Sequence, residues 1–225
     1  NTNLQTAFSW TGNLATGSNA EVDIGDFDFQ NGSAFIIKVW TSEPNNITDC
    51  NHKNDTISSD ELAGSLCGTY TVGGNNPDFV SFSEVAEVLN TAGISCPVTF
   101  LVRDGTYFEK LILREIKGSS EENTITFRSE SGDSTLAVIQ IDPAAIQFES
   151  MIYLEKTKHI IFKGLGLFTG SDVSNTNNAI LLQGANDIEI SGCFFKANTQ
   201  NDFGLVIQGG SQGVTVKNNR FECPD

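Results

Sequence analysis

The hydrophobic residues in the C-terminal half of the chain form short strands that recur in a fixed order. The first strand position recurs at residues 151–154, 179–182 and 204–207, with offsets of 28 and 25. The second recurs at residues 160–162, 188–190 and 214–216, with offsets of 28 and 26. The third has the same offsets as the second and is marked by Leu167, Phe195 and Phe221. Three strands that repeat in one order at this period predict a solenoid.

Successive coils of a solenoid are one strand spacing apart, about 4.8 Å, so equivalent side chains should stack in ladders. Four ladders are predicted to point inward: Ile152, Ile180 and Leu205; Leu154, Leu182 and Ile207; Phe162, Ile190 and Val216; and Leu167, Phe195 and Phe221. Glycines recur in the turns, at Gly184 and Gly209 and at Gly164 and Gly192. Less regular coils are predicted at residues 98–102, 111–113, 125–127, 138–141 and 146–148.

One helix is predicted, over residues 81–92. Ser81 and Glu84 have the spacing of a capping box, and Val80 and Val85 have the spacing of a hydrophobic staple. A glycine follows the last helical residue and should end the helix. Because a solenoid needs capped ends, we expect this helix to cover the N-terminal end of the coils.

The segment 1–61 has a different pattern, with short apolar runs between turns rich in Gly, Asn and Pro. Strands are predicted at residues 8–11, 20–24, 34–41 and 55–59. Short strands separated by such turns are typical of an antiparallel sandwich. Because such a sandwich usually has about seven strands, only part of one is predicted here.

Charge narrows the possible partners. The chain has 28 acidic and 13 basic residues, a net charge of −15, and no cluster of Lys and Arg, so we expect no binding to nucleic acid or to an anionic membrane surface. No apolar run approaches the roughly 20 residues of a membrane span, so membrane insertion is not expected. Acidic residues outnumber basic ones 10 to 2 up to Asp78 and 18 to 11 beyond it, which supports two domains.

The five cysteines do not form a CxxC motif or a Cys/His cluster, so no zinc site is expected. Cys67 could pair with Cys96, or Cys50 with Cys67, because spacing alone does not fix the connectivity. An odd number leaves at least one thiol free or its partner missing.

Two stretches resemble known modules. Residues 34–41 followed by Asn54-Asp55-Thr56-Ile57 resemble the Ig-like (CARDB-like) modules of large surface proteins of the Bacteroidetes. Residues 68–74, 78–79, 81–82, 93–100 and 105–107 resemble the entry into the β-helix domains of secreted Bacteroidetes proteins, which belong to the pectin-lyase-like fold group. The resemblance implies an exported, multi-domain protein, secreted or at the cell surface. The fold group includes polysaccharide lyases, glycoside hydrolases and adhesins, so it implies the fold more firmly than the activity.

The predicted fold is therefore all-β. Residues 1–61 form a partial Ig-like β-sandwich and residues 62–74 a junction. Residues 75–225 form the N-terminal part of a right-handed parallel β-helix, including the capping helix. Since no cap follows the last strand, we expect the natural protein to continue past Asp225 and the chain to be an internal fragment.

Three groups of residues are candidates for a site. Tyr153, Leu181 and Val206 should point outward between inward neighbours, as a binding platform or under a neighbouring loop or chain. Lys163 and Lys217, with Lys196 and Arg220, could line an outer face that binds an anionic substrate, or simply form a solvated face.

The third candidate is a calcium site. Asp172 and Asp202 fall in corresponding loops with several asparagines, and these oxygens could hold Ca²⁺ or serve only the turns. No catalytic residue is assigned, because no grouping of Lys, Arg and Asp matches a catalytic motif.

The leading functional interpretation is an adhesion or carbohydrate-binding scaffold whose partner is a polysaccharide or another extracellular ligand. One alternative is a polysaccharide lyase or glycoside hydrolase with its active site on the flank of the β-helix. A third is a purely structural stalk.

Overall fold

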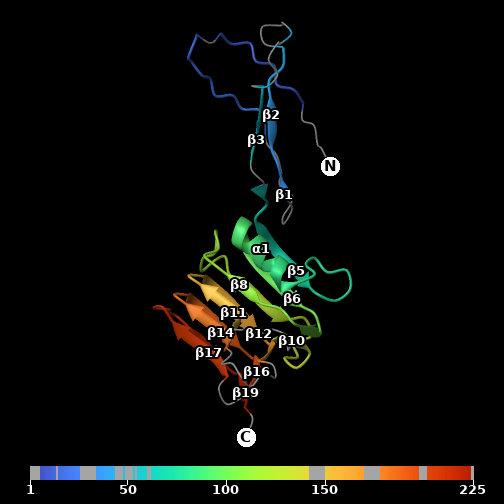
Figure 1. Ribbon diagram of the computed structural model, residues 1–225, viewed down its shortest axis with the longest axis vertical. Coiled ribbons are helices and arrows are strands. Elements are labelled where there is room, and N and C mark those ends of the chain that lie inside the picture. The colour runs from blue at the N-terminus through green and yellow to red at the C-terminus, as the bar shows by residue number, and fades with distance from the viewer. Residues whose placement is uncertain are drawn as a thin grey trace.

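Three parallel sheets wind around one core in the computed structural model (Figure 1), which describes residues 6–13, 15–25, 34–43, 48, 53, 55–59, 62–141, 150–169, 178–197 and 202–223. A six-stranded sheet runs in the order β18 (Thr215–Lys217), β15 (Asn186–Ser191), β12 (Lys158–Lys163), β9 (Ile125–Ser129), β6 (Ile94–Val102), β5 (Leu66–Val72). A four-stranded sheet runs β17 (Phe203–Gln208), β14 (Asn178–Gln183), β11 (Ser150–Glu155), β8 (Leu111–Leu113). A five-stranded sheet runs β19 (Arg220–Glu222), β16 (Phe194–Lys196), β13 (Gly166–Phe168), β10 (Ala137–Gln140), β7 (Gly105–Tyr107).

Every pairing within these three sheets is parallel. From β6 onward the chain visits the three sheets in turn, with one strand in each sheet per coil. The predicted parallel β-helix is confirmed. Of the less regular coils, those predicted near residues 98–102, 111–113, 125–127 and 138–141 correspond to β6, β8, β9 and β10. The one predicted at residues 146–148 lies outside the described residues.

All four predicted inward ladders are in register. Ile152 pairs with Ile180 and Ile180 with Leu205, and the other three ladders follow the same pattern: Leu154, Leu182 and Ile207; Phe162, Ile190 and Val216; Leu167, Phe195 and Phe221. Because parallel strands stack without an offset, apolar residues at one repeat position form a continuous apolar surface that excludes water.

Phenylalanine rings stack on one another inside this core. The ring of Phe127 lies between those of Phe100 and Phe162, with centroids 4.8 and 5.3 Å away and planes 18° and 13° apart. All three side chains are fully buried. A phenyl ring can stack from coil to coil without burying a hydrogen-bonding group that lacks a partner. This explains why the chain has 16 Phe but only 3 Tyr and 2 Trp.

The recurring glycines lie where the backbone turns between sheets. Gly164 and Gly192 follow β12 and β15 with φ of 64° and 61°, and Asn218 has φ of 56° at the equivalent place in the next coil. Only Gly, or a residue such as Asn, adopts this conformation at low cost. The next residue, Asn219, accepts from the Cys193 amide at 2.8 Å and donates to the Ile190 carbonyl at 2.9 Å, tying one turn to the turn before it.

Helix α1 (Phe82–Ala92) covers the N-terminal end of the coils, as predicted (Figure 1). Ser81 Oγ accepts from the Glu84 amide at 3.1 Å, whereas the Glu84 carboxylate accepts from the Val80 amide at 2.8 Å. The hydrophobic staple is wrong, because the Val80 side chain is 69% exposed and so does not pack on the buried Val85.

The disulfide Cys67–Cys96, one of the two predicted pairings, joins β5 to β6. Of the other described cysteines, Cys193 is a buried free thiol and Cys223 an exposed one. Cys50 lies outside the described residues.

The N-terminal part extends away from the capped end (Figure 1). Two antiparallel pairs form here, β1 (Ala34–Phe35) with β4 (Leu62–Ala63) and β2 (Lys38–Trp40) with β3 (Thr56–Ser58). The strands predicted at residues 8–11 and 20–24 do not form. Their apolar side chains, such as Phe8 and Ile24, each 54% exposed, gain no burial that would favour a strand. The Ig-like sandwich and the division at residues 61 and 74 stay predictions.

At the other end, the last coil leaves its ladders open. Ile207, Val216 and Phe221 are 48%, 43% and 56% exposed, whereas their neighbours one coil earlier are at most 2% exposed.

The described residues include no helix long and apolar enough to cross a membrane.

Candidate functional site

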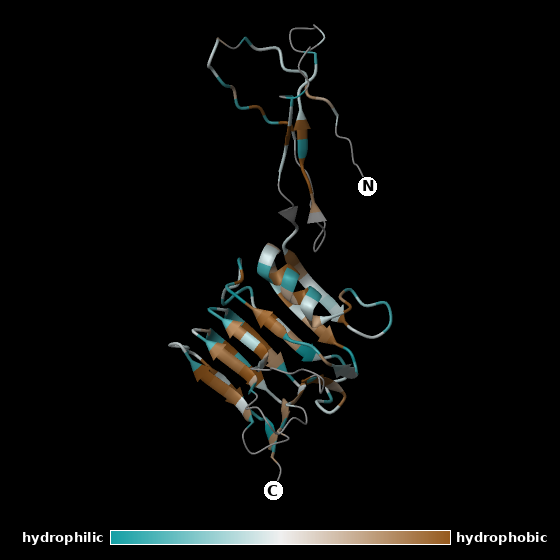
Figure 2. Ribbon diagram, viewed as in Figure 1, coloured by the Kyte–Doolittle hydropathy of each residue, from teal (hydrophilic) through white to brown (hydrophobic). Residues whose placement is uncertain are grey.

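Four apolar side chains line the outside of the four-stranded sheet. Tyr153 pairs with Ile112 on one side and with Leu181 on the other, and Leu181 pairs with Val206. All four are half-buried. We call Ile112, Tyr153, Leu181 and Val206 the apolar ladder. The predicted outward position of three of its members is confirmed, and Figure 2 shows the strands of this sheet as mainly hydrophobic ribbons that end in polar turns.

A polar ladder runs beside the apolar one. Glu155 pairs with Gln183 and Gln183 with Gln208, two positions along each strand from the apolar ladder. Above them Arg114 contacts Glu155, with Nε and Oε2 3.5 Å apart. Arg114, Glu155, Gln183 and Gln208 form the polar ladder, and both ladders together form the ladder face. The polar members were not predicted from the sequence, although Glu155, Gln183 and Gln208 share the offsets of 28 and 25 that mark their strands.

The polar groups of the ladder face have hydrogen-bonding capacity to spare. Within the described residues, the Tyr153 hydroxyl and the Gln183 and Gln208 carboxamides make no hydrogen bond to protein. The Gln183 side chain lies against Gly209, where a Cβ would come within 2.4 Å of its Nε2. Gly209 also has φ of 67°, a conformation that favours glycine. A side chain at this position would therefore strain the turn and displace the side chain of Gln183.

This arrangement has the chemistry of a sugar-binding surface. An aromatic ring and aliphatic side chains cover the apolar faces of a sugar ring, while carboxamides both donate to and accept from hydroxyl groups. The only charges on the face, those of Arg114 and Glu155, are paired with each other.

Lys163 and Lys217 do not join the ladder face. They lie on the outside of the six-stranded sheet, in one column with Ser191 between them. Lys217 Nζ lies 3.0 Å from Glu189 Oε2. The pKa of the Glu189 carboxyl is lowered by its hydrogen bonds from Lys217 and Ser191.

The other two cations considered with them lie elsewhere. Lys196 and Arg220 are on the five-stranded sheet, where both contact Glu222, at 3.6 and 2.9 Å. The four cations therefore do not line one face, because they come from different strand positions of the repeat.

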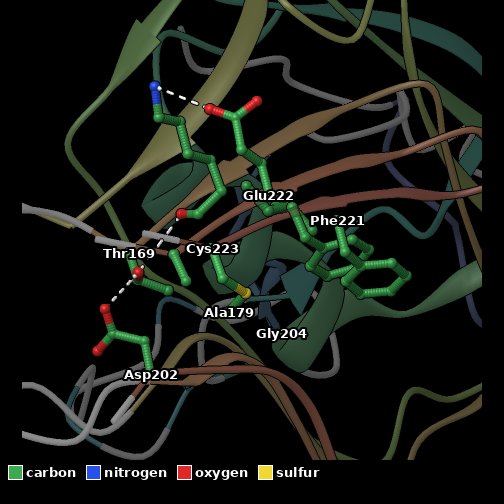
Figure 3. A pocket seen from close by; sticks show the side chains of 11 residues that line it. Thr169, Ala179, Asp202, Gly204, Phe221, Glu222 and Cys223 are labelled. Atoms are coloured by element: carbon green, nitrogen blue, oxygen red, sulfur yellow. Dashed lines mark hydrogen bonds and ion pairs between the residues drawn. The ribbon is translucent and has the colours of Figure 1, made fainter. Parts of the chain in front are cut away.

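Asp202 lies beside a small hollow near the last coil (Figure 3). Its Oδ2 accepts a hydrogen bond from Thr169 Oγ1 at 2.8 Å. Asp172 lies outside the described residues. The described residues contain no group of three or more His, Cys, Asp or Glu side chains placed to hold a metal ion. Calcium binding at Asp172 and Asp202 stays a prediction.

Comparisons with known proteins add little to the geometry. No family model matches the chain, and no curated protein does. Among solved structures, the chain is similar to the pectin methylesterase from Aspergillus niger in deglycosylated form, with 12% identity and a TM-score of 0.41. The match covers 71% of this chain and 60% of the esterase. The strand pairing described above, and not this distant similarity, carries the fold.

Proposed function

We propose that this chain belongs to a secreted or cell-surface protein and serves as an adhesive, carbohydrate-binding scaffold. One observation carries the proposal: the ladder face presents an apolar and a polar row side by side over successive coils, with Tyr153, Gln183 and Gln208 free to bind a ligand. A glycan gains little from contacts with any one coil, so a rigid face that offers apolar and polar contacts over several coils suits it.

The extracellular location is part of the proposal. The Cys67–Cys96 disulfide supports it, since disulfides persist mainly in oxidising compartments. The resemblance to secreted pectin-lyase-like proteins of the Bacteroidetes, with an Ig-like module before the β-helix, is in keeping with such a location.

A polysaccharide panel tests the proposal. The full chain, immobilised through its N-terminal segment, should retain at least one neutral or weakly charged polysaccharide. Tyr153→Ala should reduce that retention by about tenfold, because the ring is the largest apolar contact on the face. Ile161→Ala is the matched control, since Ile161 is a half-buried outward residue on the six-stranded sheet. Its binding should equal that of the wild type.

Two outcomes would overturn the scaffold interpretation. Equal loss of binding in both variants would show that the ladder face is not the site. Unsaturated products or new reducing ends, released from a polysaccharide by the chain, would favour the lyase or hydrolase alternative instead.

A further inference from the structure

Three cations stand in one column on the outside of the six-stranded sheet, away from the ladder face. Arg128 pairs with Lys163, Lys163 with Ser191, and Ser191 with Lys217. We call these four residues the basic column. Lys163 and Lys217 were candidates from the sequence, whereas Arg128 was not. It follows Phe127 just as Lys163 follows Phe162, so the repeat itself marks it.

The two ends of the column differ in how their charge is balanced. Lys217 is held by Glu189 at 3.0 Å, and Ser191 Oγ donates to the same carboxylate at 2.9 Å. Lys163 is close enough to Glu189 to contribute to its lowered pKa without forming an ion pair with it. Among the described residues, no ion pair involves Arg128 or Lys163, and both are exposed.

Arg128 and Lys163 therefore face each other across adjacent strands without an acid between them. Like charges directly opposite on neighbouring strands are destabilising, and strands in a sheet lie only about 4.8 Å apart. Such a pair is conspicuous in a chain with 28 acidic and 13 basic residues. An anion bound between the two side chains would relieve the repulsion, and a guanidinium offers an oxyanion two parallel hydrogen bonds.

We propose that the basic column is a second binding surface, specific for acidic polysaccharides that carry carboxylate or sulfate groups. The column lies on an open face, so a single small anion would be held weakly. A polymer with repeating anions can engage Arg128, Lys163 and Lys217 together and gain from multivalency. The outward neighbours of Arg128 and Lys163 on their own strands are Thr126 and Ile161, and neither has an aromatic ring on which a nucleobase could stack.

This site does not depend on the ladder face, and binding measurements separate the two. The full chain should bind dextran sulfate, alginate or both at low salt, should bind neutral dextran far more weakly, and should lose affinity as salt rises. The response to dextran sulfate against that to alginate shows whether sulfate or carboxylate is the preferred group. The double variant R128Q/K163Q should bind about tenfold more weakly or worse.

The matched control removes the same net charge elsewhere. Lys117 and Lys158 are both exposed, and the K117Q/K158Q variant should bind as the wild type does. An equal loss of affinity in both double variants would show that binding depends only on net charge. An unchanged affinity of R128Q/K163Q would show that the basic column is not the binding site. Tighter binding to polyadenylate than to dextran sulfate would overturn the assignment to a polysaccharide.

A second measurement needs no ligand. If Arg128 and Lys163 repel each other, Arg128→Gln alone should raise the melting temperature by about 1–3 °C. A fall in the melting temperature would show that the two charges are already balanced in the free protein and would contradict the proposal.

Discussion

The carboxamide of Asn90 completes the edge of the four-stranded sheet by donating to the carbonyl oxygen of Ile112 at 2.9 Å. The same side chain accepts from the Arg114 amide at 2.8 Å. A helical residue thus takes the place of a strand above β8, with one donor and one acceptor where a strand would have offered the same pair. The cap closes the solenoid through hydrogen bonds as well as through apolar contact.

Replacing Asn90 by Leu should lower the free energy of unfolding by about 1–3 kcal/mol, because two backbone groups of the edge strand lose their partner. Urea unfolding followed by circular dichroism would measure the change. Glu87→Ala, at an exposed position of the same helix, is the control and should have little effect. Equal stability of the two variants would show that water replaces the carboxamide without cost.

The stacked phenylalanines should contribute unequally to the free energy of unfolding along the solenoid. Phe127→Ala should cost about 3–5 kcal/mol, since it removes a fully buried ring between two others. Phe221→Ala should cost roughly 1 kcal/mol, because that ring is 56% exposed although it stacks on Phe195 at 4.7 Å. Denaturant titration of both variants checks the ratio, and similar costs would mean that the last coil is covered in solution.

A buried hydroxyl in a turn offers a stabilising substitution. Thr157 is fully buried, and its Oγ1 has no hydrogen-bond partner among the described residues. Thr157→Val keeps the shape and removes the unpaired group, so it should raise the unfolding free energy by about 1 kcal/mol. Thr157→Ser keeps the hydroxyl, loses a methyl group and should lower it by about 1 kcal/mol. If both variants are less stable than the wild type, the hydroxyl is satisfied by a water molecule.

Asp78 should make the stability of the cap depend on pH. Its Oδ2 accepts from the Thr71 amide at 2.7 Å and from Thr71 Oγ1 at 2.8 Å, and these bonds lower the pKa of the Asp78 carboxyl. A carboxyl with a pKa lowered by folding stabilises the protein above the unfolded-state pKa of about 3.9. That contribution is lost as the pH falls through the folded-state value.

Melting curves between neutral and acidic pH would show the effect. Asp78→Asn should unfold with a smaller dependence on pH in the acidic range than the wild type does. Asp104→Asn, a change at another exposed acid, is the comparison for the general effect of removing one charge.

The sequence predicted the solenoid because its information is periodic. Ile152, Ile180 and Leu205 had to be equivalent once the offsets of 28 and 25 were recognised, and parallel pairing follows from a repeat that always runs in one direction. The helix was predictable because Ser81 and Glu84 are a local signal whose physics involves one turn of chain.

What the sequence could not predict depends on contacts between distant residues. Nothing in the local pattern around Asn90 indicates that it pairs with the edge strand 22 residues later. The strands predicted near Phe8 and Ile24 failed for a related reason. Alternating apolar residues favour a strand only where a second surface buries them, and no such surface covers these two, each 54% exposed. For the site, periodicity located Tyr153, Leu181 and Val206, but their polar neighbours drew no attention because Glu and Gln are common on any surface.

The disulfide has a mechanical consequence. Cys67 precedes helix α1 and Cys96 follows it at a sequence separation of 29, so the loop that the bond closes contains the whole cap. Tension applied through the N-terminal segment reaches Cys67 first and crosses the covalent bond directly into β6. The force does not pass through the helix. A molecule under tension would therefore resist through the strand pairing of its first coil, and helix α1 would not be pulled away from the core first.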